Sequence, residues 1–383
     1  MKTIMDPSIQ IVGASVRAAA QSAVRAGMRP VCADCFADLD LLETCHVEKI
    51  RAYPGELAEI VTRGPDVPWM YTGGLENYPD LVDEISQHRT LLGNLGAVLR
   101  PVRDPSVGLR ALSAAGLGVP ESRAVDHPPP TDGSWLLKSQ RSSGGLGVRI
   151  YRGQRVPRTG TFFQRRVAGI SCAATYVATS RQTILLGVTE QIVNQPWTGA
   201  PSFAYAGSVG PLELDNPIKA EVVQIGDVLR CQFGLRGLFG VDGILAQRRW
   251  WTIEINPRYP ASVEILERAY GLSTARLHVD ACSDEKTTQV TTSAAPGNFH
   301  GKAIVYATQR VAASPEFCHW TAAQNKRHQP WPRFADLPHP GAEFSQGDPV
   351  LTTFATDTSR LRVVERLTQR LLEVRCRLQP VLK

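Results

Sequence analysis

Two acidic residues and an asparagine lie in neighbouring apolar segments near the middle of the chain. Asp242 interrupts the apolar segment VDGIL, while Glu254 and Asn256 lie at the end of the β-prone segment that follows, just before Arg258. Side chains alternate between the faces of a strand, so Glu254 and Asn256 point to the same side. If the two segments pair as a hairpin, Asp242 can join them. Two carboxylates and an amide oxygen suit Mg²⁺, and Arg258 could pair there with a phosphate.

A lysine and a glycine-rich loop form a second candidate site. Lys138 ends an expected strand at 135–138, and the loop leads to a second expected strand at 148–151. Glycine permits positive φ and close approach of backbone N–H groups to anionic oxygens, and the lysine adds a point charge. No G-K-[ST] precedes a helix, so this is not a Walker loop. The loop residues that could hold phosphate are Ser142, Ser143, Gly144, Gly145 and Gly147.

Each segment also has a simpler interpretation. An acid on a strand is often only solvated, Asn-Pro often only marks a turn, and a Ser- and Gly-rich loop can be a plain hairpin turn. Taken together, however, the two segments resemble the ATP-grasp superfamily over roughly residues 95–280. This resemblance implies that Asp242, Glu254 and Asn256 hold Mg²⁺ or Mn²⁺ against ATP. It also implies that Lys138 and the loop clamp the phosphates, while Arg258 stabilises the transferring phosphoryl group.

Two further segments extend the resemblance. The order F-x-Q-x-x-V-x-G at 162–169 is similar to the segment whose backbone reads the adenine edge, which implies adenine contacts for Gln164, Arg165 and Val167. Many family members have a phosphate-binding lysine before the helix expected near residue 109. Here Arg103 stands at that position, which keeps the charge but changes the geometry.

The resemblance implies an ATP-dependent, ADP-forming ligase for small molecules. A substrate carboxylate would attack the γ-phosphate to give an acylphosphate, and an amine would then displace phosphate. Catalysis of this kind needs positioning and charge neutralisation rather than a protein nucleophile. Two alternatives stay open: a small-molecule kinase of the same fold, and a non-catalytic nucleotide-binding regulatory protein.

The elements expected around these residues predict a mixed α/β and α+β chain with an ATP-grasp fold. Residues 1–95 read as a parallel α/β domain, residues 96–282 as the ATP-grasp core with a lid at about 125–165, and residues 283–383 as a small β-rich part with a terminal helix. Residues 283–298 are polar and predict a linker. In the first domain, a turn with Gly73, Gly74 and Glu76 is expected to line the cleft, because α/β sheets bind ligands at the carboxyl ends of their strands. Ser15 is expected to cap a helix, and Glu264 to be a solvated or paired acid.

The C-terminal run D-L-P-x-P-G-x-x-F-x-x-G-D-P-V, residues 336–350, points to a narrower resemblance. It is similar to a subdomain in ATP-grasp ligases linked to methanofuran and tetrahydromethanopterin one-carbon metabolism, of the tyramine–glutamate ligase type. This resemblance favours a role in assembling one-carbon cofactors. It does not name the carboxylate or the amine.

Composition excludes several other classes. The net charge is +6 over 383 residues, but Lys and Arg are dispersed, so nucleic-acid binding is not expected. No apolar run is long enough for a membrane span and no signal peptide is evident. The eight cysteines are too irregular for a disulfide framework, which predicts reduced thiols in the cytoplasm. Cys32, Cys35, Cys45 and His46 lie close together in the sequence, but zinc binding by them is the less favoured interpretation. The oligomeric state is open, although dimers are common in the superfamily.

Overall fold

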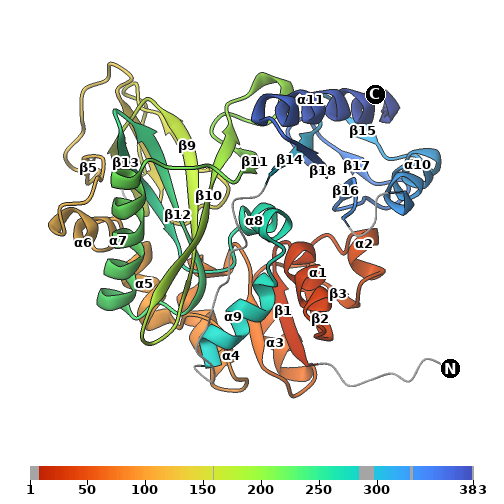
Figure 1. The fold of residues 1–383 in the computed structure, drawn as a ribbon, viewed down its shortest axis with the longest axis horizontal. Coiled ribbons are helices and arrows are strands. Elements are labelled where there is room, and N and C mark those ends of the chain that lie inside the picture. Colours follow the sequence, from red (N-terminus) through yellow and green to blue (C-terminus); the bar gives the residue numbers. More distant parts are fainter. Residues whose placement is uncertain (1–7, 158, 284–296, 328–330, 382–383) are drawn as a thin grey trace.

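The computed structural model describes residues 8–157, 159–283, 297–327 and 331–381, whose strands form four sheets (Figure 1). The predicted linker at 283–298 falls almost entirely outside these residues. None of the described helices is long and apolar enough to cross a membrane.

The N-terminal part is a parallel sheet between two layers of helices, as predicted. Ile9 and Ile11 of the first strand pack towards one helical layer and Val12 towards the other, as alternation along a strand requires. The strand order is β3 (His46–Lys49), β2 (Pro30–Asp34), β1 (Ile9–Gly13) and β4 (Trp69–Tyr71). The helices of this part are α1 (Arg17–Arg25), α2 (Leu39–Leu42), α3 (Leu57–Arg63), η1 (Leu75–Asn77) and α4 (Pro79–Ser86).

The largest sheet is antiparallel and runs through the middle of the molecule (Figure 1). Tyr176 and Phe239, on adjacent strands, stack with ring centroids 4.8 Å apart under the long helix α7 (Asn216–Phe233). The sheet order is β13 (Arg249–Asn256), β12 (Gly237–Ala246), β9 (Ile170–Ala178), β10 (Thr183–Val193), β11 (Tyr205–Gly210), β14 (Phe299–Tyr306), β18 (Pro349–Asp357) and β16 (Phe334–Ala335). Helices α8 (Val263–Tyr270) and α9 (Thr274–Ser283) follow the β12–β13 hairpin and pack between this sheet and the N-terminal part.

A smaller four-stranded sheet covers one side of the large sheet. Its own core is formed by Trp135, Leu137, Tyr151 and Phe163. Its strand order is β5 (Ser122–Arg123), β8 (Thr161–Arg165), β6 (Trp135–Ser139) and β7 (Val148–Ile150). Helices α5 (Gly96–Arg103) and α6 (Gly108–Ala114) connect the N-terminal part to this sheet.

Three strands of the C-terminal residues, β14, β18 and β16, extend the large sheet. β11 pairs with β14, and a side chain at Gly207 would come within 2.1 Å of the Lys302 carbonyl oxygen, so glycine permits this close pairing. The amphipathic helix α11 (Arg360–Arg377) covers these strands through buried Val363, Leu367, Leu371 and Val374. The remaining elements are η2 (Pro196–Thr198), α10 (Pro315–Lys326) and a sheet of β17 (Glu343–Phe344), β15 (Val311–Ala312) and β19 (Gln379–Pro380).

One local prediction is wrong. Helix α1 begins at Arg17 with Val16 in the capping position, and no side chain caps it. Ser15 therefore does not cap this helix; the carboxylate of Asp34, in the neighbouring strand, instead accepts a hydrogen bond from the N–H group of Val16 at 2.7 Å.

His278 in α9 connects the large sheet to the N-terminal part. Its Nδ1 accepts a hydrogen bond from the Leu238 N–H at 2.8 Å, and its Nε2 donates to the Leu92 carbonyl at 3.0 Å. The side chain is buried, and burial lowers the pKa of His278 to about 4. The imidazole is therefore neutral in the fold over a range of pH where an exposed histidine is charged.

We expect this histidine to weaken the fold in mild acid. The lowered pKa means that the unfolded chain binds more protons between about pH 4 and 6.5, so stability falls as pH falls through that window. Between pH 7 and pH 5 the loss from His278 is about 2 kcal/mol. Urea unfolding at both pH values measures it, with His278→Gln as the comparison. Equal pH dependence in the two proteins would contradict this assignment.

Candidate active site

The predicted hairpin is confirmed, and it brings the two acids and the amide together. Asp242 of β12 lies opposite Glu254 of β13, and the Asn256 Nδ2 donates to Asp242 Oδ2 at 3.1 Å. The turn consists of Gln247 and Arg248, whose φ angles of 51° and 58° fit the two-residue turns that join tightly paired strands.

Burial raises the pKa of Asp242 to about 7, with the neighbouring charge of Glu254 as the second cause. For Glu254, burial acts in the same direction, but the charges of Arg103 and Lys138 outweigh it and hold the pKa below its ordinary value. Two carboxylates held this close favour binding of a cation. The described residues include no group of three or more His, Cys, Asp or Glu side chains placed to bind a metal, so a metal here would depend on the Asn256 amide as a third ligand.

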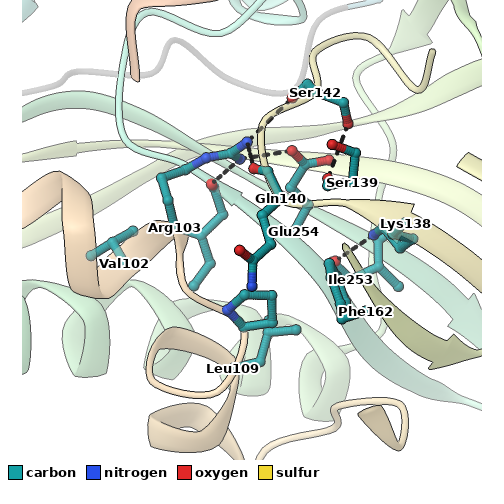
Figure 2. Close-up of a pocket in the computed structure, with 12 residues that line it drawn as sticks. Val102, Arg103, Leu109, Lys138, Ser139, Gln140, Ser142, Phe162, Ile253 and Glu254 are labelled. Carbon is teal, nitrogen blue, oxygen red and sulfur yellow. Dashed lines mark hydrogen bonds and ion pairs between the residues drawn. The ribbon is translucent and has the colours of Figure 1, made fainter. Parts of the chain in front are cut away.

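Arg103 links the acids to the glycine-rich loop (Figure 2). Its Nη1 donates to Glu254 Oε1 at 2.7 Å, and its Nη2 donates to the Ser142 carbonyl at 3.2 Å and to Asn77 Oδ1 at 3.1 Å. The sequence placed Arg103 at a phosphate-binding position. The structure puts it in a small pocket beside Lys138 and Glu254, while its contact with phosphate stays a prediction.

Lys138 lies on the other side of the acids, at the end of β6. Its Nζ donates to the Ile253 carbonyl at 3.0 Å and to Gln164 Oε1 at 3.2 Å, and the side chain is buried. Burial lowers the pKa of Lys138, although the charges of Glu254 and Asp242 act against this shift. Its two acceptors are neutral, so the ammonium can also interact with an anion in the cleft.

The glycine-rich loop is held over the cleft by two contacts near its middle. The Gly144 carbonyl accepts a hydrogen bond from the Tyr205 N–H at 2.9 Å, and Ser143 Oγ accepts one from Asn77 Nδ2 at 3.3 Å. Gly144 and Gly145 have φ angles of 62° and 80°, which favour glycine. The loop therefore contacts both the N-terminal part and the large sheet.

Arg258 is held by the turn that follows β4. Its Nε donates to Glu76 Oε1 at 3.0 Å and its Nη2 to Asn256 Oδ1 at 3.2 Å, while Glu76 Oε2 accepts the Gly74 N–H at 2.6 Å. Of the three turn residues expected to line the cleft, Gly73 does so. The prediction is wrong for Gly74 and Glu76, because the carboxylate lies behind Arg258 and orients it.

The two acids, Asn256, Lys138, Arg258 and the loop residues 143–145 face one cavity of about 830 Å³. Arg103 and Ser142 line a small pocket beside it, together with Lys138 and Glu254. The first end of the large cavity lies between the small sheet and the large sheet and is lined by Gln164, Arg165 and Val167, together with apolar Leu136, Val148, Ile170, Ile244 and Ile253. Contact of the first three residues with adenine stays a prediction. This end suits a flat, partly apolar group such as a nucleobase. Its second end lies towards the N-terminal part and β14, and includes Ser15, Arg17, Thr72, Tyr205, Ser262, Lys302, Asp336 and Thr352.

Sequence reasoning missed Gln191 in β10. Its Nε2 donates to Asp242 Oδ1 at 3.0 Å and its Oε1 accepts from Ser171 Oγ at 2.8 Å, so its amide orientation is fixed. Gln191 thus positions Asp242 from two strands away. Alternation within β10 could have placed it on a face, but its contact depends on the register between strands.

The cysteine cluster lies away from this cavity. The sulfur atoms of Cys32 and Cys45 are 3.4 Å apart, with Cys32 buried in β2 and His46 exposed. Cys35 is half-buried, and none of the four residues lines the cavity described above.

Comparisons with known proteins identify the domain and the fold. Residues 106–262 match the model of the ATP-grasp_3 family, an ATP-grasp domain. A comparison with curated protein sequences found no match.

Several solved structures have the same fold. An N5-carboxyaminoimidazole ribonucleotide synthetase in complex with ADP is 14% identical over 98% of each chain, with a TM-score of 0.70. The Aspergillus clavatus synthase, in complex with ADP and 5-aminoimidazole ribonucleotide, is 15% identical over 97% of this chain and 99% of its own, with a TM-score of 0.70. The biotin carboxylase domain of Hydrogenobacter thermophilus 2-oxoglutarate carboxylase is 12% identical over 96% of this chain and 89% of its own, with a TM-score of 0.67. The chain has an ATP-grasp fold, as the sequence predicted.

We expect Gly145→Ala to release the loop. An added Cβ would come within 1.9 Å of the Phe203 carbonyl oxygen at a φ of 80°, whereas at Gly144 nothing lies within 4 Å. Gly144→Ala therefore costs only the strain of a left-handed backbone, roughly 1–2 kcal/mol of stability, and serves as the matched control. Hydrogen exchange of residues 140–147 should be at least about tenfold faster in Gly145→Ala than in Gly144→Ala. Equal exchange would show that this contact does not hold the loop.

Proposed function

We propose that this protein is an ATP- and Mg²⁺-dependent ligase that joins a carboxylate to an amine and forms ADP. One observation carries the proposal: the paired acids Asp242 and Glu254, the cations Lys138 and Arg258 and the glycine-rich loop all face the same cavity, whose other lining suits a nucleobase. Similarity to ADP-bound structures of the same fold supports it.

The acids fit the metal that such a reaction uses. Asp242, Glu254 and Asn256 would hold Mg²⁺, because two carboxylates and an amide are the oxygen ligands it favours, and the raised pKa of Asp242 reflects burial together with the neighbouring charge of Glu254. When bound, Mg²⁺ neutralises charge on the phosphate oxygens of ATP. Gln191 and Arg103 would orient the two carboxylates by the hydrogen bonds they already make.

The other residues serve the transfer of the γ-phosphoryl group. Lys138 and the N–H groups of the loop would hold the phosphates, and Arg258 would neutralise the phosphoryl group as a carboxylate oxygen of the substrate forms a bond to phosphorus and ADP leaves. The amine nitrogen then attacks the acyl carbon of the acylphosphate, phosphate leaves with the bonding electrons, and the amine loses a proton. The loop docked on Tyr205 and Asn77 would exclude water, which otherwise hydrolyses an acylphosphate.

The amine distinguishes this reaction from the alternatives. We expect ADP release with a cognate carboxylate to rise at least about tenfold when the cognate amine is added, because the amine consumes the acylphosphate. A coupled ADP assay over pairs of amino acids and one-carbon cofactor precursors measures it. ADP formation without amine, together with a stable phosphorylated product, would identify a kinase instead.

Removing one acid tests the metal site. Glu254→Gln keeps the shape of the side chain but removes a charged ligand, so we expect Mn²⁺ affinity to fall at least about 10–100-fold and ADP formation to fall with it. Electron paramagnetic resonance titration of Mn²⁺ gives the affinity directly. Glu213→Gln, at an exposed position outside the cavity, is the matched control. A functional effect in cells that survives Glu254→Gln would favour the regulatory alternative.

A finer assignment rests on the sequence alone. The run at 336–350 favours a ligase of one-carbon cofactor assembly, related to the methanofuran and tetrahydromethanopterin systems. The proteins of known structure with the same fold include a ribonucleotide synthetase and a biotin carboxylase domain, which have other substrates. They support the ligase class, and the screen described above tests the one-carbon substrates.

A further inference from the structure

The second end of the cavity contains a buried lysine that the reaction described above does not use. Lys302 lies on β14 with 6% of its surface exposed, and both it and Ile304, two residues along the same strand face, line the cavity. Its Nζ donates to Glu264 Oε2 at 3.1 Å. Among the residues that the structure describes, Glu264 is the one hydrogen-bond partner of this ammonium, which has three N–H donors.

Glu264 supports Lys302 from behind. It belongs to α8, does not line the cavity, and also forms a buried ion pair with Arg17 of α1. Burial alone would raise the pKa of Glu264, but the charges of Arg17 and Lys302 hold it far below the ordinary value, so the acid is charged. Arg17 in turn pairs with Asp336 through Nε at 2.9 Å. Three parts of the chain therefore meet at this group of charges.

Such a group is an inefficient way to stabilise a fold. Desolvating two charges offsets most of the attraction between them, and apolar residues of similar size often do as well or better. The arrangement does have one effect that apolar residues could not supply, since it fixes an ammonium at the cavity wall while its countercharge is kept out of the cavity. That geometry suits an incoming anion.

A hydroxyl group lies beside the lysine. Ser208 pairs with Lys302 across β11 and β14, and Ser208 Oγ lies 2.8 Å from the hydroxyl of Tyr205, which lines the cavity. Burial raises the pKa of Tyr205, and the charge of Lys302 acts in the opposite direction. The phenol stays protonated near neutral pH and can donate a hydrogen bond.

We propose that Lys302, assisted by Tyr205, binds a second anionic group of the acceptor substrate, a carboxylate or a phosphate separate from the group that reacts. The acceptor role of this ligand rests on the proposed function. The anion site itself does not depend on it, because it is defined by Lys302, Glu264 and Tyr205 and not by the phosphate-binding groups. The opposing view is that Lys302 only neutralises Glu264.

Binding of small anions to the full chain tests the site without turnover. Isothermal titration with glutarate and, separately, with inorganic phosphate shows which kind of anion is accepted. We expect Lys302→Met to weaken binding of the accepted anion at least about tenfold, because a charge-assisted hydrogen bond is lost. Tyr205→Phe should weaken it less. Lys219→Met makes the same chemical change on the exposed surface of α7 and should leave the affinity unchanged.

A double substitution separates the two views. Lys302→Met with Glu264→Gln removes both charges, so no uncompensated acid is left buried and the chain keeps a neutral pair. If Lys302 binds the anion, binding stays at least about tenfold weaker in the double variant, and if it only neutralises Glu264, binding returns to the wild-type level. Wild-type affinity in Lys302→Met, or failure of wild type to bind either anion, would also overturn the proposal. If anions bind through Lys302 but ADP release does not depend on an amine, the ligase proposal is wrong and the anion site is still supported.

Discussion

The repulsion between Asp242 and Glu254 organises the centre of this protein. A hairpin with a two-residue turn brings the carboxylates opposite each other in a partly buried position, where burial and the charge of Glu254 raise the pKa of Asp242. Three cations compensate the negative charge of the acids, and each comes from a different element: Arg103 from α5, Lys138 from β6 and Arg258 from the segment after β13. Because these three side chains also reach the loop, the small sheet and the N-terminal turn, the acids determine where several parts of the fold meet.

The parts of the site that depend on short segments could be predicted from the sequence. The hairpin follows from two β-prone runs joined by a short polar turn, and Glu254, Asn256 and Arg258 follow from spacing along one strand. Lys138 and the loop were equally local, since a strand end and consecutive glycines define them. The parallel N-terminal sheet was predictable from strand–helix–strand order.

The remaining site residues depend on contacts between distant segments. Gln191 contacts Asp242 across 51 residues of sequence, and Lys302 contacts Glu264 across 38. Nothing near either residue indicates these partners, because they are set by strand register and by how α8 packs on the sheet. Glu76 is a similar case. The sequence predicted its turn, but its role behind Arg258 depends on contact with a residue 182 positions away, which the sequence does not indicate. Glu264, for which a solvated and a paired state were both open, is buried and paired.

The continuity of the large sheet also bears on how such a protein can diverge. Asp242 and Lys302 lie on β12 and β14 of one hydrogen-bonded sheet, so the spacing between the two ends of the cavity is fixed by backbone pairing rather than by a hinge. Substitutions on the inward faces of β11, β14 and β18 can therefore change which acceptor fits without displacing the acids on β12 and β13. Selection could change the ligand bound at one end of the cavity, one strand at a time, and leave the paired acids at the other end in place.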